Sequence, residues 1–122
     1  MNDISNPMIQ MLQRFLNVTS QRHTLVTSNI ANIDTPGYRT RDLDFRSELE
    51  RAVSGEADGG AEITPVARMV PGLLERPDGN NVSIDRESLL LAETQMQFNV
   101  GVELIHDQFS QIMMAINEGG KG

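Results

Sequence analysis

The sequence predicts a mainly α-helical protein with paired long N- and C-terminal helices, coiled-coil-like in their spacing, and a short irregular middle segment with minor β structure and flexible loops. Three observations support this fold class. Apolar residues recur at alternating gaps of four and three near both ends of the chain, and Gly and Pro interrupt the stretch between them. A length of 122 residues leaves room for one modest domain. We therefore divide the chain into a helix at 1–33, an irregular segment at 34–84 and a second helix at 85–122.

The first helix is predicted from about Asn6 to Asn32, with Asn6 as N-cap and Pro7 at the first helical position, where proline is tolerated. Its seam also contains Arg22 and Asn29. The apolar seam positions are Met8, Met11, Phe15, Val18 and Leu25. Such a row is either an ordinary core-facing stripe or a contact with another helix. A sustained repeat in so short a chain favours the helix contact.

The second helix is predicted from about Asp85 to Asn117, capped by Ser83 or Asp85 and ended by Gly119 and Gly120. The apolar seam positions here are Leu91, Phe98, Val102, Ile105, Phe109, Ile112 and Ile116, and Gln95 interrupts the row. Gly101 costs about 1 kcal/mol against Ala inside a helix, so either another backbone approaches closely there or the helix bends. We favour close packing.

The middle segment is predicted to be irregular. A short helix is expected over 44–53 with Asp44 as its cap, followed by a flexible Gly-rich loop at 54–62. Residues 63–74 alternate short apolar runs with prolines, which is compatible with small extended strands or a hairpin. A turn is expected at 77–80, whose sequence is Pro-Asp-Gly-Asn.

The end of the first helix predicts a rigid polar corner. Asn32 tolerates the left-handed conformation that closes helices, and Asp34 can fold its carboxylate onto a following backbone N–H. Pro36 and Gly37 suit the centre of a type II turn, while Tyr38 provides a flat amphipathic anchor.

Composition excludes several classes of function. A formal charge of -7 disfavours a nucleic-acid partner, because such binding depends on clustered Lys and Arg. The chain has no cysteine, so disulfides and thiolate chemistry are excluded. No cleavable signal and no membrane-spanning stretch are visible. We find no nucleophile elbow or phosphate loop, and we predict no enzyme activity, no catalytic residue and no cofactor.

The corner resembles the N-terminal signature of the bacterial flagellar rod and hook proteins, the axial proteins. The resemblance lies in Asn29, Ile30, Ala31 and Asn32, followed by Thr35, Pro36, Gly37 and Tyr38. Two further stretches, 41–45 (Arg-Asp-Leu-Asp-Phe) and 78–87, which begins Asp-Gly-Asn-Asn, are similar to proximal-rod members of this family. The resemblance covers both termini and the total length.

This resemblance implies one axial core domain that polymerises through its terminal helices in the proximal rod of the flagellar basal body, within the cell envelope and periplasm. It implies export by the flagellar type III apparatus without a cleavable signal peptide. The partners implied are copies of the chain itself, other rod proteins, the basal-body adaptor FliE, the MS-ring protein FliF and the export apparatus. Such a subunit would link the MS ring and export gate to the rest of the rod.

Two other classes of function remain open. A cytoplasmic helical adaptor or export chaperone would share the helices but would not need the corner signature. A small metalloenzyme would need more than Glu103 and His106, which share a helix face but lack a second half-site, so we predict no metal. An apolar export signal at Met8, Ile9, Met11 and Leu12 is a further hypothesis, although these residues belong to the first helix as well.

Overall fold

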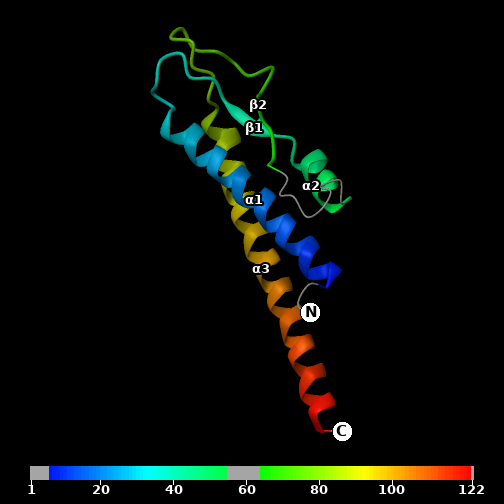
Figure 1. Ribbon diagram of the computed structural model, residues 1–122. Coiled ribbons are helices and arrows are strands. Elements are labelled where there is room, and N and C mark those ends of the chain that lie inside the picture. The colour runs from blue at the N-terminus through cyan, green and yellow to red at the C-terminus, as the bar shows by residue number, and fades with distance from the viewer. Residues whose placement is uncertain (1–5, 55–63, 122) are drawn as a thin grey trace.

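The computed structural model describes residues 6–54 and 64–121, and it is mainly helical, as predicted. Five elements follow along the chain (Figure 1): α1 (Pro7–Ala31), β1 (Arg41–Leu43), α2 (Phe45–Val53), β2 (Ala67–Met69) and α3 (Ile84–Lys121). Except for Ser54, the flexible loop predicted at 54–62 lies outside the described residues. No helix among residues 6–54 and 64–121 is long and apolar enough to cross a membrane.

The helix starts follow the predicted caps. Asn6 Oδ1 accepts the N–H of Ile9 at 2.7 Å, with Pro7 in the first turn. Asp44 caps α2 by accepting the N–H of Ser47, and Ser83 Oγ accepts the N–H of Arg86 at the start of α3. The predicted end of α3 is wrong, because the helix continues through Gly119 to Lys121. Gly119 does not adopt the positive φ that closes a helix.

The long helices α1 and α3 run antiparallel, side by side (Figure 1). His23 contacts Thr94, and Gly101 packs against Leu16, which sets their register. A Cβ on Gly101 would lie 2.6 Å from Leu16 Cδ2, so the predicted close packing at this glycine is confirmed, but the side chains of Leu16 and Phe15 make it rather than another backbone. The same register places Pro7 level with about residue 110, so α3 extends roughly 17 Å beyond the start of α1.

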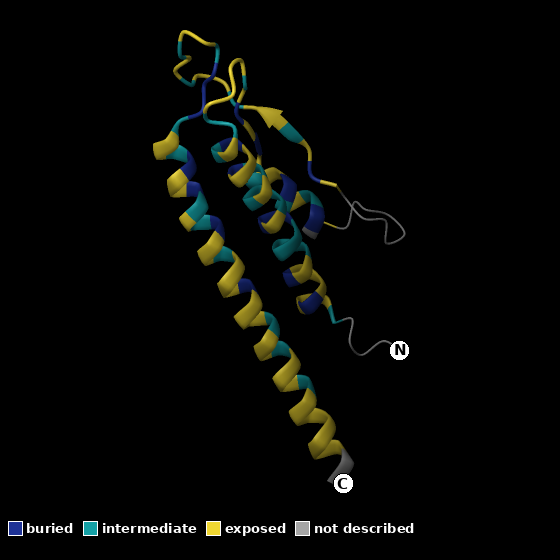
Figure 2. Ribbon diagram, turned by 90° about the vertical axis from the view of Figure 1, so that its left-hand side faces the viewer, coloured by how far each residue is buried: buried dark blue, intermediate teal, exposed yellow. Residues whose placement is uncertain are grey.

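On its other side α1 packs against β1 and α2. Val18, Leu43 and Ala52 form the buried cluster, joined by Leu25 and Phe45. Phe15 meets Phe45 edge to face, with ring centroids 5.9 Å apart. Buried residues therefore lie mainly on α1 and the middle segment, whereas most of α3 is exposed (Figure 2).

The minor β structure is a two-stranded antiparallel sheet. Leu43 pairs with Ala67, Asp42 with Arg68 and Arg41 with Met69. The hairpin considered for residues 63–74 is therefore not formed, because β2 pairs with β1 across the intervening α2 rather than with its own neighbouring residues. The turn predicted at 77–80 is confirmed, with Gly79 N–H donating to Arg76 O at 2.8 Å and Gly79 at φ 88°.

Candidate functional site

The end of α1 is closed by hydrogen bonds of Asn32. Its backbone N–H donates to Ser28 O at 3.1 Å, and its side-chain Nδ2 donates to the same oxygen at 2.8 Å. Asn32 has φ -104°, so the predicted left-handed closure is wrong. The chain instead leaves the helix through successive tight turns, since Ile33 donates to Ile30 O and Thr35 donates to Asn32 O.

The predicted type II turn is confirmed. Tyr38 N–H donates to Thr35 O at 3.2 Å, and Gly37 sits at φ 76° as the third residue of this turn. The Asx-type bond expected of Asp34 is not made among the described residues. It occurs at Asp78 instead, whose Oδ1 accepts the N–H of Asn80 at 3.0 Å.

The corner interlocks with the segment before α3. The buried side chain of Asn80 donates through Nδ2 to Asn32 O at 2.9 Å and to Thr35 O at 2.8 Å. Gly37 N–H donates to Asp78 O at 2.8 Å. A Cβ on Gly79 would lie 3.3 Å from Gly37 Cα, so the two backbones are in contact. Residues about 45 positions apart thus form one rigid polar unit.

Asn29 is the centre of this unit. It is fully buried, and its Nδ2 donates to Arg41 O at 2.8 Å and to Glu87 Oε1 at 2.9 Å. Its Oδ1 accepts from Tyr38 Oη at 3.0 Å and from Arg41 N–H at 3.2 Å. One amide therefore joins α1, the corner, β1 and the first turn of α3, using both donor hydrogens and both acceptor positions.

A cluster of charged side chains from α1, β1 and α3 lies next to Asn29. Arg22 donates two hydrogen bonds of 3.0 Å to the carboxylate of Asp42. Arg86 donates to Asp42 Oδ2 at 2.6 Å and to Glu87 Oε2 at 2.7 Å. Glu87 is fully buried and Asp42 nearly so. Burial by itself raises the pKa of Asp42, but the hydrogen bond and charge of Arg22 and the hydrogen bond of Arg86 together lower it below its ordinary value.

This cluster has a structural role: its charged groups neutralise one another within the fold. Two arginines neutralise two carboxylates, so the buried charges balance, and the carboxylate oxygens are occupied by donors. No group of three or more His, Asp or Glu suited to a metal ion occurs in the described parts of the chain. His23 Nδ1 lies 2.9 Å from Thr94 Oγ1, while His106 is exposed on α3.

Comparison with known proteins agrees with this architecture. Residues 10–39, which hold most of α1 and the corner, match the family model described as flagella basal body rod protein. The flagellar basal body rod protein FlgB of Salmonella typhimurium is 32% identical over 126 aligned positions, which cover 88% of this chain and 91% of that protein. The chain belongs to the FlgB family. FlgB of Escherichia coli is 30% identical, and FlgB of Borrelia hermsii is 29% identical over 94% of its own length.

Membership of the FlgB family gives the chain a structural role in the flagellar basal body rod, and hence in the flagellum and motility. A structural rod protein is consistent with the prediction that the chain is not an enzyme. The family also implies assembly with other rod and basal-body components. The matched residues 10–39 include the whole corner signature, Asn29 to Tyr38, which the structure shows to be interlocked with Asn80 and Glu87.

The predicted seam on α1 faces the middle segment. Phe15, Val18 and Leu25 pack against α2 and β1, whereas Met8 and Met11 near the helix start are exposed. The α1 positions that contact α3 include Leu16 and His23, one residue along from Phe15 and Arg22, and the ring of Phe15 also reaches Gly101 of α3. In this FlgB-family chain a heptad-like row on α1 thus forms its contact with the small core.

The predicted seam on α3 lies along one edge of the contact between α3 and α1. Its apolar positions are either half-buried or exposed, and none is fully buried. Leu91, Ile105 and Ile112 are half-buried, and Phe98, Val102, Phe109 and Ile116 are exposed. The residues of α3 that face α1 most directly are Glu87, Leu90, Thr94 and Gly101. The row therefore leaves apolar surface open along the length of α3.

Sequence reasoning missed the charged cluster, although one signal pointed to it. Arg22 and Asn29 occupy two positions of a row that is otherwise apolar, and such polar residues on a buried face need partners. Their partners, Asp42, Arg86 and Glu87, lie in the two stretches 41–45 and 78–87, which share the family resemblance. No local spacing links these positions, because they meet only when β1 and the start of α3 pack against α1.

Proposed function

We propose that the chain is a subunit of the proximal rod, which polymerises through α1 and α3 and links the MS ring and export gate to the rest of the rod. The supporting observation is the extension of α3 beyond α1. About 11 residues continue past the level of Pro7 and carry exposed Met113, Met114 and Ile116. An isolated helical extension of three turns is marginal in water, so it needs a neighbour.

The proposed partners are further copies of the chain, other rod proteins, the basal-body adaptor FliE, the MS-ring protein FliF and the flagellar type III export apparatus. A rigid corner suits this role better than that of a cytoplasmic adaptor or export chaperone. The corner holds the start of α3 against the end of α1, so both helices are presented to neighbours as one unit. An adaptor that binds one partner helix has no use for such a joint.

Cryo-electron microscopy of isolated basal bodies tests the proposal. The basal bodies are taken from cells in which this chain is the only FlgB-family protein. We expect density for α1, α3 and the corner at the base of the rod, next to the membrane ring. If the rod base is complete and lacks this chain, the proximal-rod role is wrong. Recovery of the chain only in the cytoplasm, bound to another exported protein, supports the adaptor or chaperone instead.

A further inference from the structure

We propose that the groove between α1 and α3 of one copy receives the opposite side of α3 from a second copy of this chain. This inference rests on the rod role proposed above and specifies the contact through which copies join. The groove and the opposite side of α3 are different surfaces, so the contact is heterologous. Repetition of a heterologous contact generates a ring or a helical filament rather than a closed dimer.

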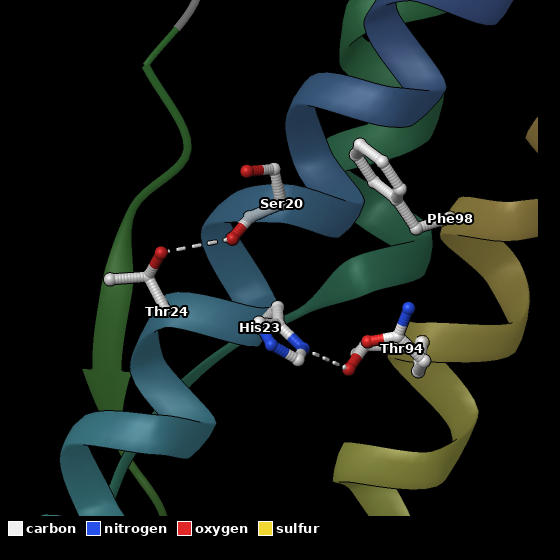
Figure 3. Close-up of a pocket in the computed structure, with 6 residues that line it drawn as sticks. Ser20, His23, Thr24, Thr94 and Phe98 are labelled. Carbon is white, nitrogen blue, oxygen red and sulfur yellow. Dashed lines mark hydrogen bonds between the residues drawn. The ribbon is translucent and has the colours of Figure 1, made fainter. Parts of the chain in front are cut away.

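The groove is an open, uncharged hollow between the two long helices (Figure 3). Its volume is about 270 Å³, and Ser20, His23 and Thr24 of α1 face Thr94, Gln95 and Phe98 of α3 across it. None of these residues is Asp, Glu, Lys or Arg. Thr24 Oγ1 donates to Ser20 O and His23 bonds Thr94, so the hydroxyl wall is already hydrogen-bonded and needs no charged partner.

Phe98, which lines this groove, belongs to an apolar row along α3, here called the lip. Its members, Leu91, Phe98, Val102 and Phe109, are separated by gaps of seven, four and seven, which places all four on the same side of α3. Phe98 is 38% exposed, Val102 44% and Phe109 40%, so α1 covers only part of each side chain. This geometry leaves room for a third helix to complete their burial.

The opposite side of α3 carries a second set of exposed apolar residues, the ridge: Leu89, Met96, Val100 and Leu104. Met96 and Val100 lie two positions on either side of Phe98, about 160° around the helix from it. They are 61% and 50% exposed. Glu93 lies near this side and reaches Arg22, which binds Asp42 of β1, so the ridge faces the β1 side and the groove faces away from it.

A second copy is the occupant that satisfies both surfaces at once. The lip and the ridge run along the same helix and therefore match in length, and both present exposed aliphatic, aromatic or Met side chains. Pairing groove with groove would leave two ridges in water, whereas pairing groove with ridge covers both surfaces in every copy except the two at the ends of the row of copies. The lip and the ridge also continue past the start of α1, at Ile116 and Met114, so the contact can extend to the next copy.

Cysteine cross-linking tests the contact, because the chain has no cysteine of its own. Thr24→Cys marks the groove, and Met96→Cys or Val100→Cys marks the ridge. We expect mixed disulfides between copies carrying Thr24→Cys and copies carrying a ridge cysteine. The double variant Thr24→Cys/Val100→Cys, expressed as the sole copy, should give a ladder of oligomers in basal bodies. Asn99→Cys, on the polar outer side of α3, replaces the ridge cysteine as the matched control and should give no ladder.

The outcomes separate this contact from the rod role. Disulfide-linked dimers from Thr24→Cys alone would show groove-to-groove pairing and overturn the inference. If the double variant supports swimming and is found in basal bodies but stays monomeric after oxidation, the groove–ridge contact is wrong while the rod role stands. If the chain with its own sequence is absent from basal bodies, the rod role fails and this inference fails with it.

Discussion

At the corner, Asn29, Asn80 and Glu87 are buried and hydrogen-bonded within the chain, whereas α3 beyond Gly101 leaves Val102, Phe109 and other apolar side chains exposed. The first region is complete in one copy, because each of these three buried side chains has its partners in the same chain. The second has apolar surface without a partner among the described residues. This difference supports our proposal that α3 provides the surface for neighbours, while the corner holds α1 and α3 together within one copy.

We expect the largest effect from a charge placed on the exposed part of α3. Phe109→Asp should abolish polymerisation, because a carboxylate would be buried against an apolar neighbour without a counter-charge. The monomer should remain soluble and helical, since Phe109 lies far from the corner. Circular dichroism measures the helical content of the monomer, and sedimentation measures polymerisation. Ser110→Asp, on the exposed polar side of the same turn, is the matched control and should still assemble.

Ile105→Asp sharpens the same test, because Ile105 is half-buried against α1. We expect the same loss of polymerisation, with some loss of monomer stability that Phe109→Asp should not cause. Assembly of either variant at the level of the unchanged chain would remove the role assigned to this side of α3.

Asn29→Ala tests whether the corner is complete within one copy. The change removes the amide that joins Tyr38, Arg41 and Glu87, and it leaves the buried Glu87 carboxylate with one donor fewer. We expect a loss of about 3 kcal/mol in the free energy of unfolding of the monomer. Urea unfolding measures this loss. Asn117→Ala, on the exposed end of α3, should change stability by less than about 0.5 kcal/mol.

Asp42→Asn tests the charged cluster through its pH dependence. The folded pKa of Asp42 lies below its ordinary value of 3.8, so its ion pairs stabilise the fold above that pH and are lost as the pH falls through the folded pKa. At pH 7 the variant should lose about 2 kcal/mol, because Asn cannot neutralise Arg22 and Arg86. The difference in stability between the two proteins should shrink below pH 3.8. An equal difference well above and well below that pH would contradict the charge interpretation.

Replacing Pro36 and Gly37 by Ala tests the turn alone and should have the smallest effect on stability. Gly37 has φ 76°, which costs Ala about 1 kcal/mol. A Cβ added at Gly37 would meet open space, so backbone strain rather than a clash is the cause. We expect swimming in soft agar to fall more than export of the chain into the medium. If export of the chain into the medium is lost instead, without a greater loss of swimming, the corner serves export.

The elements that depend on local chemistry could be predicted from the residues alone. Asn6, Asp44 and Ser83 start their helices because a side-chain oxygen can satisfy a free N–H only a few residues away. The turn at Pro36 and Gly37 was predictable for the same reason, since ring closure and a positive φ are properties of those residues. The row on α3 was visible because helical spacing places its members on one side.

The surfaces against which these elements pack could not be predicted, because they depend on the folded arrangement of the whole chain. The α1 row was visible as a pattern, yet Val18 and Leu25 pack on Leu43 and Phe45 because β1 and α2 fold onto that side. The pairing of β1 with β2 and the link from Asn29 to Glu87 join residues tens of positions apart, where no local rule applies. The corner itself was readable from the chain, whereas the partners that make it rigid are set by the return of α3 along α1, since burial is a property of the folded whole.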